Sequence, residues 1–462
     1  MIKLLYRLKQ IQPEISKLLK DGSSVGIFSQ NLHQQSVEFY HPLLPHWRDI
    51  HLEYDLLRVQ LAHKFDQLLQ TQKNLNLTQP QPDLIFKQAL IAALVYAEIL
   101  ERMNLLMNNP QEIWRLQQDQ TLYRKCLRVY GIPFYYPARD FFDRQNPSLS
   151  DQIRQVTAST NWPRLMLVRI KRVLDTLVPL VKNAESFRRM VYVIDTLLNP
   201  IFAYLAWIFY VPRLATNVFN TMKNTITRSS MDQFQQMLNW QRRLLVQWQK
   251  LWFELCNDSI WMTVGLINCF VLTGALAPAA IYLTVFLYIF DIILAGIRAF
   301  IEINRFKKLS GDYEQMIVSE SVFEQSELCE YKSLLDQHIK YEKARLWLSV
   351  GTTSALFFGM CFALPVFAIN PFIPAFGASF IVLTCLLGFY TAKKIEPMQP
   401  KAELPKNREL SRSGFFKAKV SEPILLLQNE GISRLSLFAE QNHRRVHSAN
   451  ISNFRQIANH PG

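Results

Sequence analysis

Two long apolar blocks, residues 259–300 and 346–392, constrain the fold more than any other feature of this 462-residue chain. Each block divides near its middle, the first at Pro278 and the second at the Ile-Asn-Pro of 369–371, into halves of about 20 residues. A helix of that length covers about 30 Å, which is the thickness of the hydrocarbon layer of a bilayer. The sequence therefore predicts a multi-pass integral membrane protein with two transmembrane helical hairpins, and hence four spans.

Charged residues around the two blocks predict how the hairpins are oriented. The turns at 275–280 and 369–374 carry no charge, whereas lysines and arginines gather at the open ends of both hairpins. The positive-inside rule then places both termini and residues 301–345 in the cytoplasm. The formal charge of +14 favours anionic lipid headgroups as partners. Nucleic acid is not expected as a partner, because the sequence has no zinc-finger spacing, glycine-rich RNA motif or contiguous basic run.

Outside the two blocks the sequence pattern is helical. Apolar residues recur every three to four positions in residues 1–189, and breakers that contain proline or glycine separate the helical segments. Residues 84–107 contain an uncharged run that is too short to span a bilayer, which predicts a buried core helix. We therefore expect an all-α chain with a mainly helical cytoplasmic domain at 1–189, a charged cytoplasmic helical extension at 301–345 and a mostly disordered basic tail at 393–462.

The two segments before the first block allow more than one interpretation. Residues 190–212 are long enough to span but contain Asp195, Asn199 and Pro200, so a re-entrant or interfacial element kinked at Pro200 is preferred over a fifth span or a buried soluble helix. Residues 213–258 are interpreted as an amphipathic interfacial region, and packing on the cytoplasmic domain explains their pattern equally well. The candidate interfacial anchors are Trp240, Trp248, Trp252, Arg243 and Lys250.

One carboxylate, Asp291, lies inside the predicted spans. It precedes Arg298 by seven residues, which places it about 10 Å along the helix from that basic residue. It is either an ion- or proton-binding group or a carboxyl that holds helices together by hydrogen bonds through Tyr288, Asn268 or Thr352. The predicted spans contain no second acid or histidine for a relay, so the structural role is preferred. The candidate intramembrane polar residues are Asp291, Tyr288, Asn268, Thr352, Thr353 and Ser354.

Small residues repeat at four-residue spacing in two of the predicted spans. Such rows let helix backbones approach closely, which is typical of a packed bundle or an oligomer. The candidate packing residues are Gly351, Ala355 and Gly359 in the third span and Gly265, Cys269 and Thr273 in the first.

Residues able to support metal binding or catalysis are few. His46, Asp49 and Glu53 could share one helix face as metal ligands, but a polar helix surface is the preferred interpretation. Cys126 has basic neighbours that could lower the pKa of its thiol, although no histidine is identifiably paired with it. The six cysteines form no Cys-x-x-Cys pair, and none of the common catalytic motifs is present. We therefore expect no metal and no cofactor, and we lean against an enzyme.

These features lead to one preferred hypothesis and two alternatives. A helical soluble domain joined to glycine-poor hairpins, with a Gln/Asn-rich surface, is similar to poorly characterised membrane proteins and to secreted effectors of intracellular bacteria, a likeness of composition that carries no motif. The preferred hypothesis is a membrane-anchored, non-enzymatic scaffold that presents its helical domain to protein partners, with homo-oligomers as one form it could take. The alternatives are a transporter or channel subunit that uses Asp291, and a membrane-associated enzyme that acts on lipid.

Overall fold

Every element of the described chain is a helix. The computed structural model describes residues 5–20, 25–74, 84–132, 149–181, 184–208, 210–226, 233–276, 278–318, 322–367 and 369–402. These residues contain no strand, so the all-α prediction is confirmed for them. Most of the predicted basic tail, from residue 403 onward, lies outside the described residues.

The first seven helices form an N-terminal domain, residues 5–132, around one apolar core. At its centre lies α6, in which every residue from Ala89 to Glu101 is buried, because the helix is apolar on nearly all sides. The helices are α1 (Tyr6–Ile11), α2 (Glu14–Lys20), α3 (Val25–Gln34), α4 (Val37–Tyr40), α5 (Trp47–Asn74), α6 (Leu84–Leu106) and α7 (Pro110–Val129), with a 3-10 turn at Leu44–His46 before α5.

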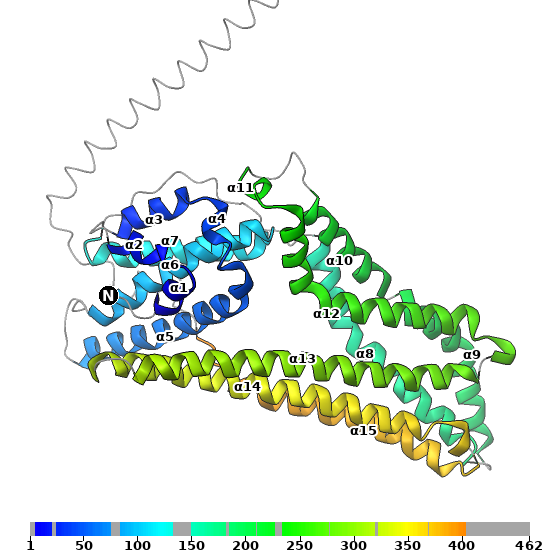
Figure 1. The fold of residues 1–462 in the computed structure, drawn as a ribbon. Helices are drawn as coiled ribbons and strands as arrows, with labels where there is room; N and C mark the ends of the chain where they lie inside the picture. The colour runs from blue at the N-terminus through cyan, green and yellow to red at the C-terminus, as the bar shows by residue number, and fades with distance from the viewer. Residues whose placement is uncertain are drawn as a thin grey trace, which may run out of the picture.

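Apart from α11, which contacts α6, the remaining helices extend away from this domain (Figure 1). We call the described parts of residues 149–300 and 346–398 the distal bundle. Its helices are α8 (Leu149–Leu177), α9 (Glu185–Ile208), α10 (Tyr210–Thr225), α11 (Gln233–Gln236), α12 (Trp240–Leu266), α13 (Ala279–Val318), α14 (Val322–Cys361) and α15 (Phe372–Ile395). Shorter turns follow α12 at Ile267–Val271 (a π-helix) and Gly274–Leu276, α14 at Pro365–Phe367, and α15 at Glu396–Met398.

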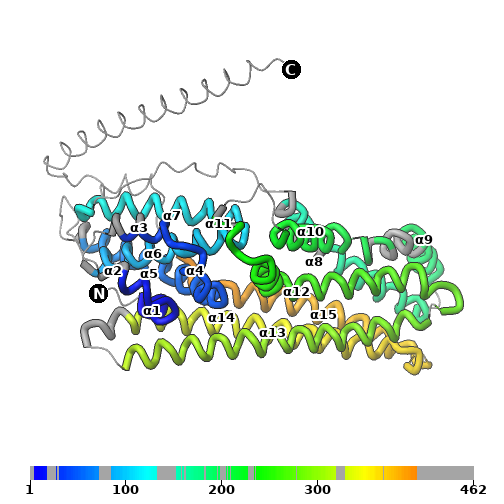
Figure 2. Tube along the Cα trace, turned by 45° about the horizontal axis from the view of Figure 1, so that its top comes forward, coloured from blue at the N-terminus to red at the C-terminus, as the bar shows by residue number. Residues whose placement is uncertain are grey.

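Two continuous helices, α13 and α14, belong to both parts of the molecule. Each is 40 residues long, or about 60 Å, and they lie side by side from the far turns to the N-terminal domain (Figure 2). Their ends nearest that domain place Phe306, Tyr313 and Leu335, among others, in its apolar core. The predicted extension at 301–345 is therefore a continuation of the helices that begin and end in the apolar blocks.

Two of the four predicted spans coincide with helices that are long and apolar enough to cross a membrane. These helices are Ala279–Val318 and the stretch Phe372–Met398. The other two predicted spans, 259–278 and 346–368, are interrupted, because α12 gives way to a π-helix after Leu266 and α14 ends at Cys361. The first block also does not form a tightly packed pair, since α12 packs mainly on α9 and α10 and separates from α13 beyond their common turn (Figure 1). Four spans are thus not confirmed.

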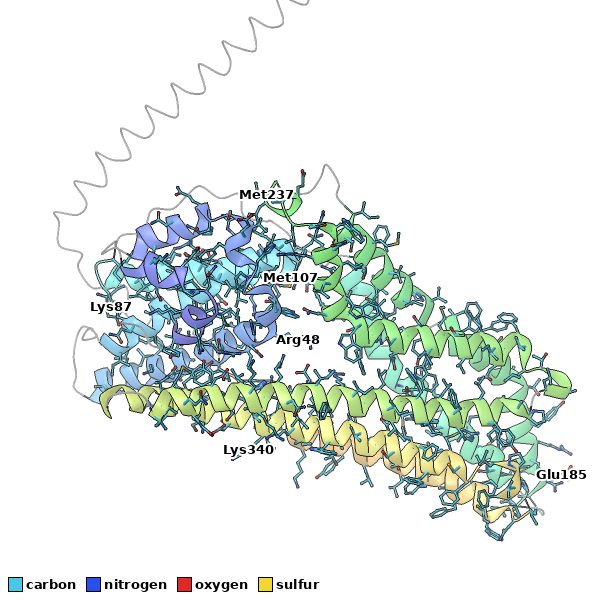
Figure 3. The ribbon with its side chains drawn as sticks, in the orientation of Figure 1. Arg48, Lys87, Met107, Glu185, Met237 and Lys340 are labelled. Atoms are coloured by element: carbon cyan, nitrogen blue, oxygen red, sulfur yellow. The ribbon has the colours of Figure 1, made fainter. Side chains whose placement is uncertain are left out.

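A third turn lies at the far end of the distal bundle. Glu185, which begins α9, is located there (Figure 3), and Arg188 and Arg189 follow it with exposed side chains. The predicted absence of charge holds for the turns at 275–280 and 369–374 but not for this end of the molecule. The charge that breaks the pattern comes from the first residues of α9, which are distant in sequence from either apolar block.

Candidate functional site

A cleft of about 600 Å³ lies where the N-terminal domain meets the distal bundle. We call it the junction cleft. Helix α5 forms one wall and contributes Arg48, which lies between α5 and α13 (Figure 3). The side chains that line the junction cleft are Trp47, Arg48, His51, Leu52, Asp55, Arg213, Lys250, Trp252, Phe253, Glu254, Arg298, Glu302, Arg305, Phe306, His338, Glu342 and Leu346.

Most carboxylates of the junction cleft already have basic partners. Glu302 accepts from Arg48 Nη1 at 2.8 Å and pairs with Arg305 Nη2 at 3.0 Å. Glu342 pairs with Arg345 at 3.2 Å. Arg48 also donates to the Gln249 backbone carbonyl at 2.7 Å, which ties α5 to α12 as well as to α13.

Arg298 is held differently. Its guanidinium carbon lies 4.5 Å from the centre of the Phe253 ring, a cation–π contact between α13 and α12. Among the described residues, no carboxylate lies within ion-pair distance of it. The junction cleft therefore contains a guanidinium that is positioned by an aromatic ring and retains its hydrogen-bonding donors for another group.

His51, from α5, adds a further positive charge to the junction cleft. Burial lowers the pKa of His51, but the hydrogen bonds and negative charges of Asp55 and Glu112 outweigh it and raise the pKa to about 9. The ring nitrogens lie 3.0 Å from Asp55 and 3.4 Å from Glu112. His338 behaves in the opposite way, because burial lowers its pKa below the usual value.

Behind the junction cleft, a polar hub joins the first helix to α13 and α14. Glu53 is fully buried and accepts from Arg7 Nη1 at 2.9 Å, from the Tyr96 hydroxyl at 2.9 Å and from the Tyr313 hydroxyl at 3.1 Å. The Tyr331 hydroxyl donates to the Glu53 backbone carbonyl at 3.2 Å. Burial raises the pKa of Glu53, although its partners oppose that effect. The hub connects α1, α5, α6, α13 and α14.

Two of the three candidate metal ligands, Asp49 and Glu53, belong to the same hub. Asp49 and Glu53 do share a face of α5, but the guanidinium of Arg7 bridges them, at 2.9 Å from each. His46 lies in the 3-10 turn before α5, and burial and the nearby Arg7 charge lower its pKa. Within the described parts of the chain, no group of three His, Cys, Asp or Glu residues is arranged to hold a metal. A cation is thus already present where a metal would lie.

Helices α10 and α12 pack against each other through a buried polar seam that the sequence reasoning missed. Moving from the junction cleft toward the far end, Asn217 donates to Glu254 at 3.4 Å, Arg213 pairs with fully buried Asp258 at 2.8 Å, and Tyr210 stacks on Trp261 with ring centres 6.4 Å apart. Gly265 then lies against Trp207. The sequence does contain a signal for this seam. The polar, aromatic and small residues at 254, 258, 261, 265 and 268 are spaced alternately four and three apart, so they share one face of a helix.

Asp291, the predicted intramembrane carboxylate, touches this seam. Trp261 Nε1 donates to Asp291 Oδ1 at 3.3 Å, and the Trp261 ring also packs edge-on against Tyr288. Of the other predicted polar residues, Asn268 continues the stripe of α12, Thr353 donates to the Ser349 backbone carbonyl, and Thr352 lies beside Gly388 of α15. Ser354 is half-buried on α14. The described hydrogen bond of Asp291 joins α13 to α12, and its donor is Trp261 instead of one of the expected partners Tyr288, Asn268 and Thr352.

The predicted packing residues differ in how closely they approach a neighbour. A Cβ on Gly359 would lie 2.5 Å from Ile381 of α15, and one on Gly265 would lie 2.7 Å from Trp207 Cβ of α9. A Cβ on Gly351, in contrast, would meet no described atom within 4 Å. Ala355 and Cys269 are half-buried, and Thr273 is exposed at the turn. Of the predicted packing residues, Gly359 and Gly265 therefore lie in close helix contacts, whereas Gly351 does not.

The predicted interfacial anchors lie in three different environments. Trp240 and Trp248 are exposed on α12, whereas Trp252 and Lys250 line the junction cleft. Arg243 is buried. Cys126 is fully buried in the N-terminal core, and burial raises the pKa of its thiol to about 12 despite the opposing charge of Lys125. This environment disfavours a nucleophilic role for Cys126.

No protein-family model, curated protein or solved structure matches this chain.

Proposed function

We propose that this chain is a membrane-anchored, non-enzymatic scaffold whose distal bundle lies in a bilayer and whose N-terminal domain is held at the membrane surface for protein partners. One observation carries the proposal. Among the described residues, large exposed apolar side chains number two in the N-terminal domain, Tyr6 and Trp114, and all the others lie between Val156 and Met398. Soluble proteins rarely expose apolar surface on this scale.

The two most apolar helices are exposed rather than part of a core. Only 11% of the apolar window of α13 and 28% of that of α15 is buried, whereas the core helix of a soluble protein would be mostly buried. Helix α8 also exposes apolar side chains on its outer face and directs its arginines inward. Its Arg164, Arg169 and Arg172 point inward to Tyr210, Cys385 and Met360, while Leu167, Val168 and Ile170 face outward. An apolar solvent favours this arrangement.

The orientation of the chain and its membrane-embedded helices follow from charge and helix length. We place the N-terminal domain in the cytoplasm, because the larger excess of lysine and arginine lies at that end of the bundle. Helix α9 is unbroken through Pro200 and covers about 36 Å from the far end. That length supports the crossing alternative for residues 190–212. Besides the four spans proposed from the apolar blocks, we therefore include α9 and its neighbour α8 in the membrane-embedded bundle.

The scaffold role rests on rigidity. Because α13 and α14 run unbroken from the distal bundle into the N-terminal core, the domain cannot rotate freely on its anchor. A transporter would need water at Asp291, but Trp261 is bonded to that carboxylate and Asp258 is paired with Arg213. Buried pairs of this kind serve packing, so the channel alternative is less well supported.

The membrane placement can be tested by cysteine accessibility. In a chain whose six cysteines are replaced, Phe286→Cys on the exposed face of α13 and Lys340→Cys on α14 are compared with a membrane-impermeant maleimide. Both side chains are exposed in the isolated chain. In unsealed membranes Lys340→Cys should label and Phe286→Cys should not, and both should label after denaturation. Equal labelling in native membranes would contradict the placement of α13 in the bilayer.

The same variants test the scaffold role. A maleimide-linked photocrosslinker on Lys340→Cys, positioned on the outer side of α14 (Figure 3), should give a discrete adduct with another protein in native membranes. The matched crosslinker on Phe286→Cys, introduced in mild detergent and returned to lipid, should give lipid adducts only. If neither position nor others on the N-terminal domain gives a protein adduct, the scaffold role is wrong even when the membrane placement holds.

A further inference from the structure

Two arginines of α8 point into the distal bundle without a carboxylate partner. Arg169 Nη1 donates to Cys385 Sγ of α15 at 2.6 Å, and Arg172 Nη1 donates to Met360 Sδ of α14 at 2.7 Å. Among the described residues, no carboxylate lies within ion-pair distance of either guanidinium. The acceptors that the described chain offers them are sulfur atoms, which accept hydrogen bonds only weakly.

The surroundings of the two guanidiniums supply no counter-charge. Met360 and Cys385 belong to a small apolar core that also contains Met166, Leu356 and Ile381. The nearest acid along α8, Asp175, is already paired with Lys171 at 2.7 Å. A charge in an apolar environment is costly unless an opposite charge accompanies it. Two positive charges of the bundle therefore lack a described negative partner.

The spacing of the two arginines suits a single oxyanion. Side chains three residues apart lie next to each other on a helix, so both guanidiniums project from the same side of α8. The planar fork of a guanidinium matches the oxygen atoms of phosphate or carboxylate. Each of the two arginines uses one nitrogen for its described hydrogen bond to sulfur, which leaves its other donors for a ligand.

The depth of the pair indicates which oxyanion could reach it. Arg169 lies eight residues before the end of α8 at Leu177, or about 12 Å along the helix. Its partner Cys385 lies thirteen residues after the start of α15 at Phe372, or about 20 Å. Both of these helix ends are at the far end of the bundle (Figure 1). A lipid headgroup stays near the membrane surface, so this depth favours a small ion that enters the bundle.

We propose that Arg169 and Arg172 bind a small oxyanion of the phosphate class between α8, α14 and α15. The ion neutralises both guanidiniums and joins α8 to the α14–α15 pair. This binding site goes beyond the scaffold role but rests on the membrane placement of the bundle, because guanidiniums that faced water would need no bound counter-ion.

The test uses the purified full chain in a mild non-ionic detergent, dialysed into phosphate-free buffer. Binding of radiolabelled inorganic phosphate is measured by equilibrium dialysis, and thermal unfolding is followed with phosphate or chloride at equal ionic strength. Arg169→Gln and Arg172→Gln each remove one guanidinium. Arg189→Gln is the matched control, because this arginine of α9 belongs to the same bundle but its side chain is 78% exposed. Circular dichroism checks that each variant folds.

We expect one saturable phosphate per chain and a rise in melting temperature that chloride does not reproduce, because a spherical ion does not match the planar fork. Arg169→Gln and Arg172→Gln should each weaken phosphate binding by about tenfold or more, the effect of losing hydrogen bonds to a charged group. Arg189→Gln should leave the binding unchanged. Without phosphate, the first two variants should melt no lower than the unmodified chain, because each removes a charge that has no partner.

A further variant covers the case in which a glutamine variant does not fold. Arg172→Lys keeps the charge but loses the fork, so it should bind phosphate more weakly than the unmodified chain. Absence of saturable phosphate binding by the folded chain, equal binding by the α8 variants and the unmodified chain, or an equal thermal effect of chloride would overturn the proposal.

Two further measurements separate the proposal from its alternatives. Displacement of bound phosphate by dioctanoyl-phosphatidylglycerol would assign the site to a lipid headgroup and would overturn the small-ion proposal, so we expect none. Labelling of Phe286→Cys in membranes is measured independently. A failure of the oxyanion site is therefore distinguishable from a failure of the membrane placement.

Discussion

At the scale of single residues, the sequence indicates which side chains share a helix face but not which distant group meets them. His46, Asp49 and Glu53 were grouped by helical spacing, and Asp49 and Glu53 do act together. Their partner is Arg7, 42 and 46 residues away in the sequence, and no local pattern identifies it. For Asp291 the sequence identified the residue and proposed hydrogen-bonded packing, but the donor, Trp261, lies 30 residues away.

His51 gives a residue-scale prediction about pH. Its folded pKa of about 9 lies above the unfolded value of about 6.5, so its stabilising contribution is complete below pH 6.5 and is lost as pH rises through 9. The side chain is 21% exposed, and we expect a contribution of up to about 3 kcal/mol. Denaturant unfolding of the full chain in detergent at pH 6 and pH 9.5 should show this decrease.

A matched pair of variants isolates the His51 contribution. His51→Gln should remove most of the decrease in unfolding free energy between the two pH values. His63→Gln, on an exposed position of the same helix, should retain it. An unchanged pH dependence in His51→Gln would show that its carboxylate partners do not hold the charged ring in the folded chain.

At the scale of helices, the apolar pattern predicted the core helix and two of the four spans as long apolar helices, and it misplaced the ends of the elements. Residues 84–107 form the buried core helix expected from a short apolar run, and 279–300 and 372–392 lie in long apolar helices. The predicted boundary at residue 301 does not exist in α13, because charge density changes there while helix propensity does not. The pairing of α10 with α12 was missed because their polar stripe is indistinguishable from a solvated face until its partner is known.

The α14–α15 contact gives the element-scale prediction. A Cβ on Gly359 would lie 2.5 Å from Ile381 Cγ1, and one on Gly351 would meet no described atom within 4 Å. Because both glycines are in the same helix, Gly→Ala gives each the same gain in helix propensity. We expect Gly359→Ala to be less stable than Gly351→Ala by about 1–3 kcal/mol, the usual effect of overpacking. Thermal unfolding in detergent measures the difference, and equal melting temperatures would contradict the close contact.

At the scale of the whole molecule, the N-terminal domain and the bundle share structure and are not two units joined by a linker. The core of residues 5–132 is completed by Phe306, Leu309 and Tyr313 of α13 and by Tyr331 and Leu335 of α14. Tyr313 and Tyr331 also supply hydroxyl donors to the Glu53 hub. Sequence reasoning placed a domain boundary near residue 190, because contacts across more than 200 residues leave no local signal.

This shared core predicts that residues 1–132 do not fold alone. Without α13 and α14, the fragment exposes apolar surface and leaves the buried Glu53 carboxylate with fewer donors, which costs more than a small domain can tolerate. We expect strong binding of a hydrophobic dye and a non-cooperative melt. Joining residues 301–345 to the fragment through a flexible linker should restore a cooperative melt and reduce dye binding. The same fusion with Tyr313→Ala and Leu335→Ala should not, because it restores chain length but not the core side chains. A cooperative melt of 1–132 alone would mean that α13 and α14 dock on a finished domain, and the anchor would then be separable from the scaffold.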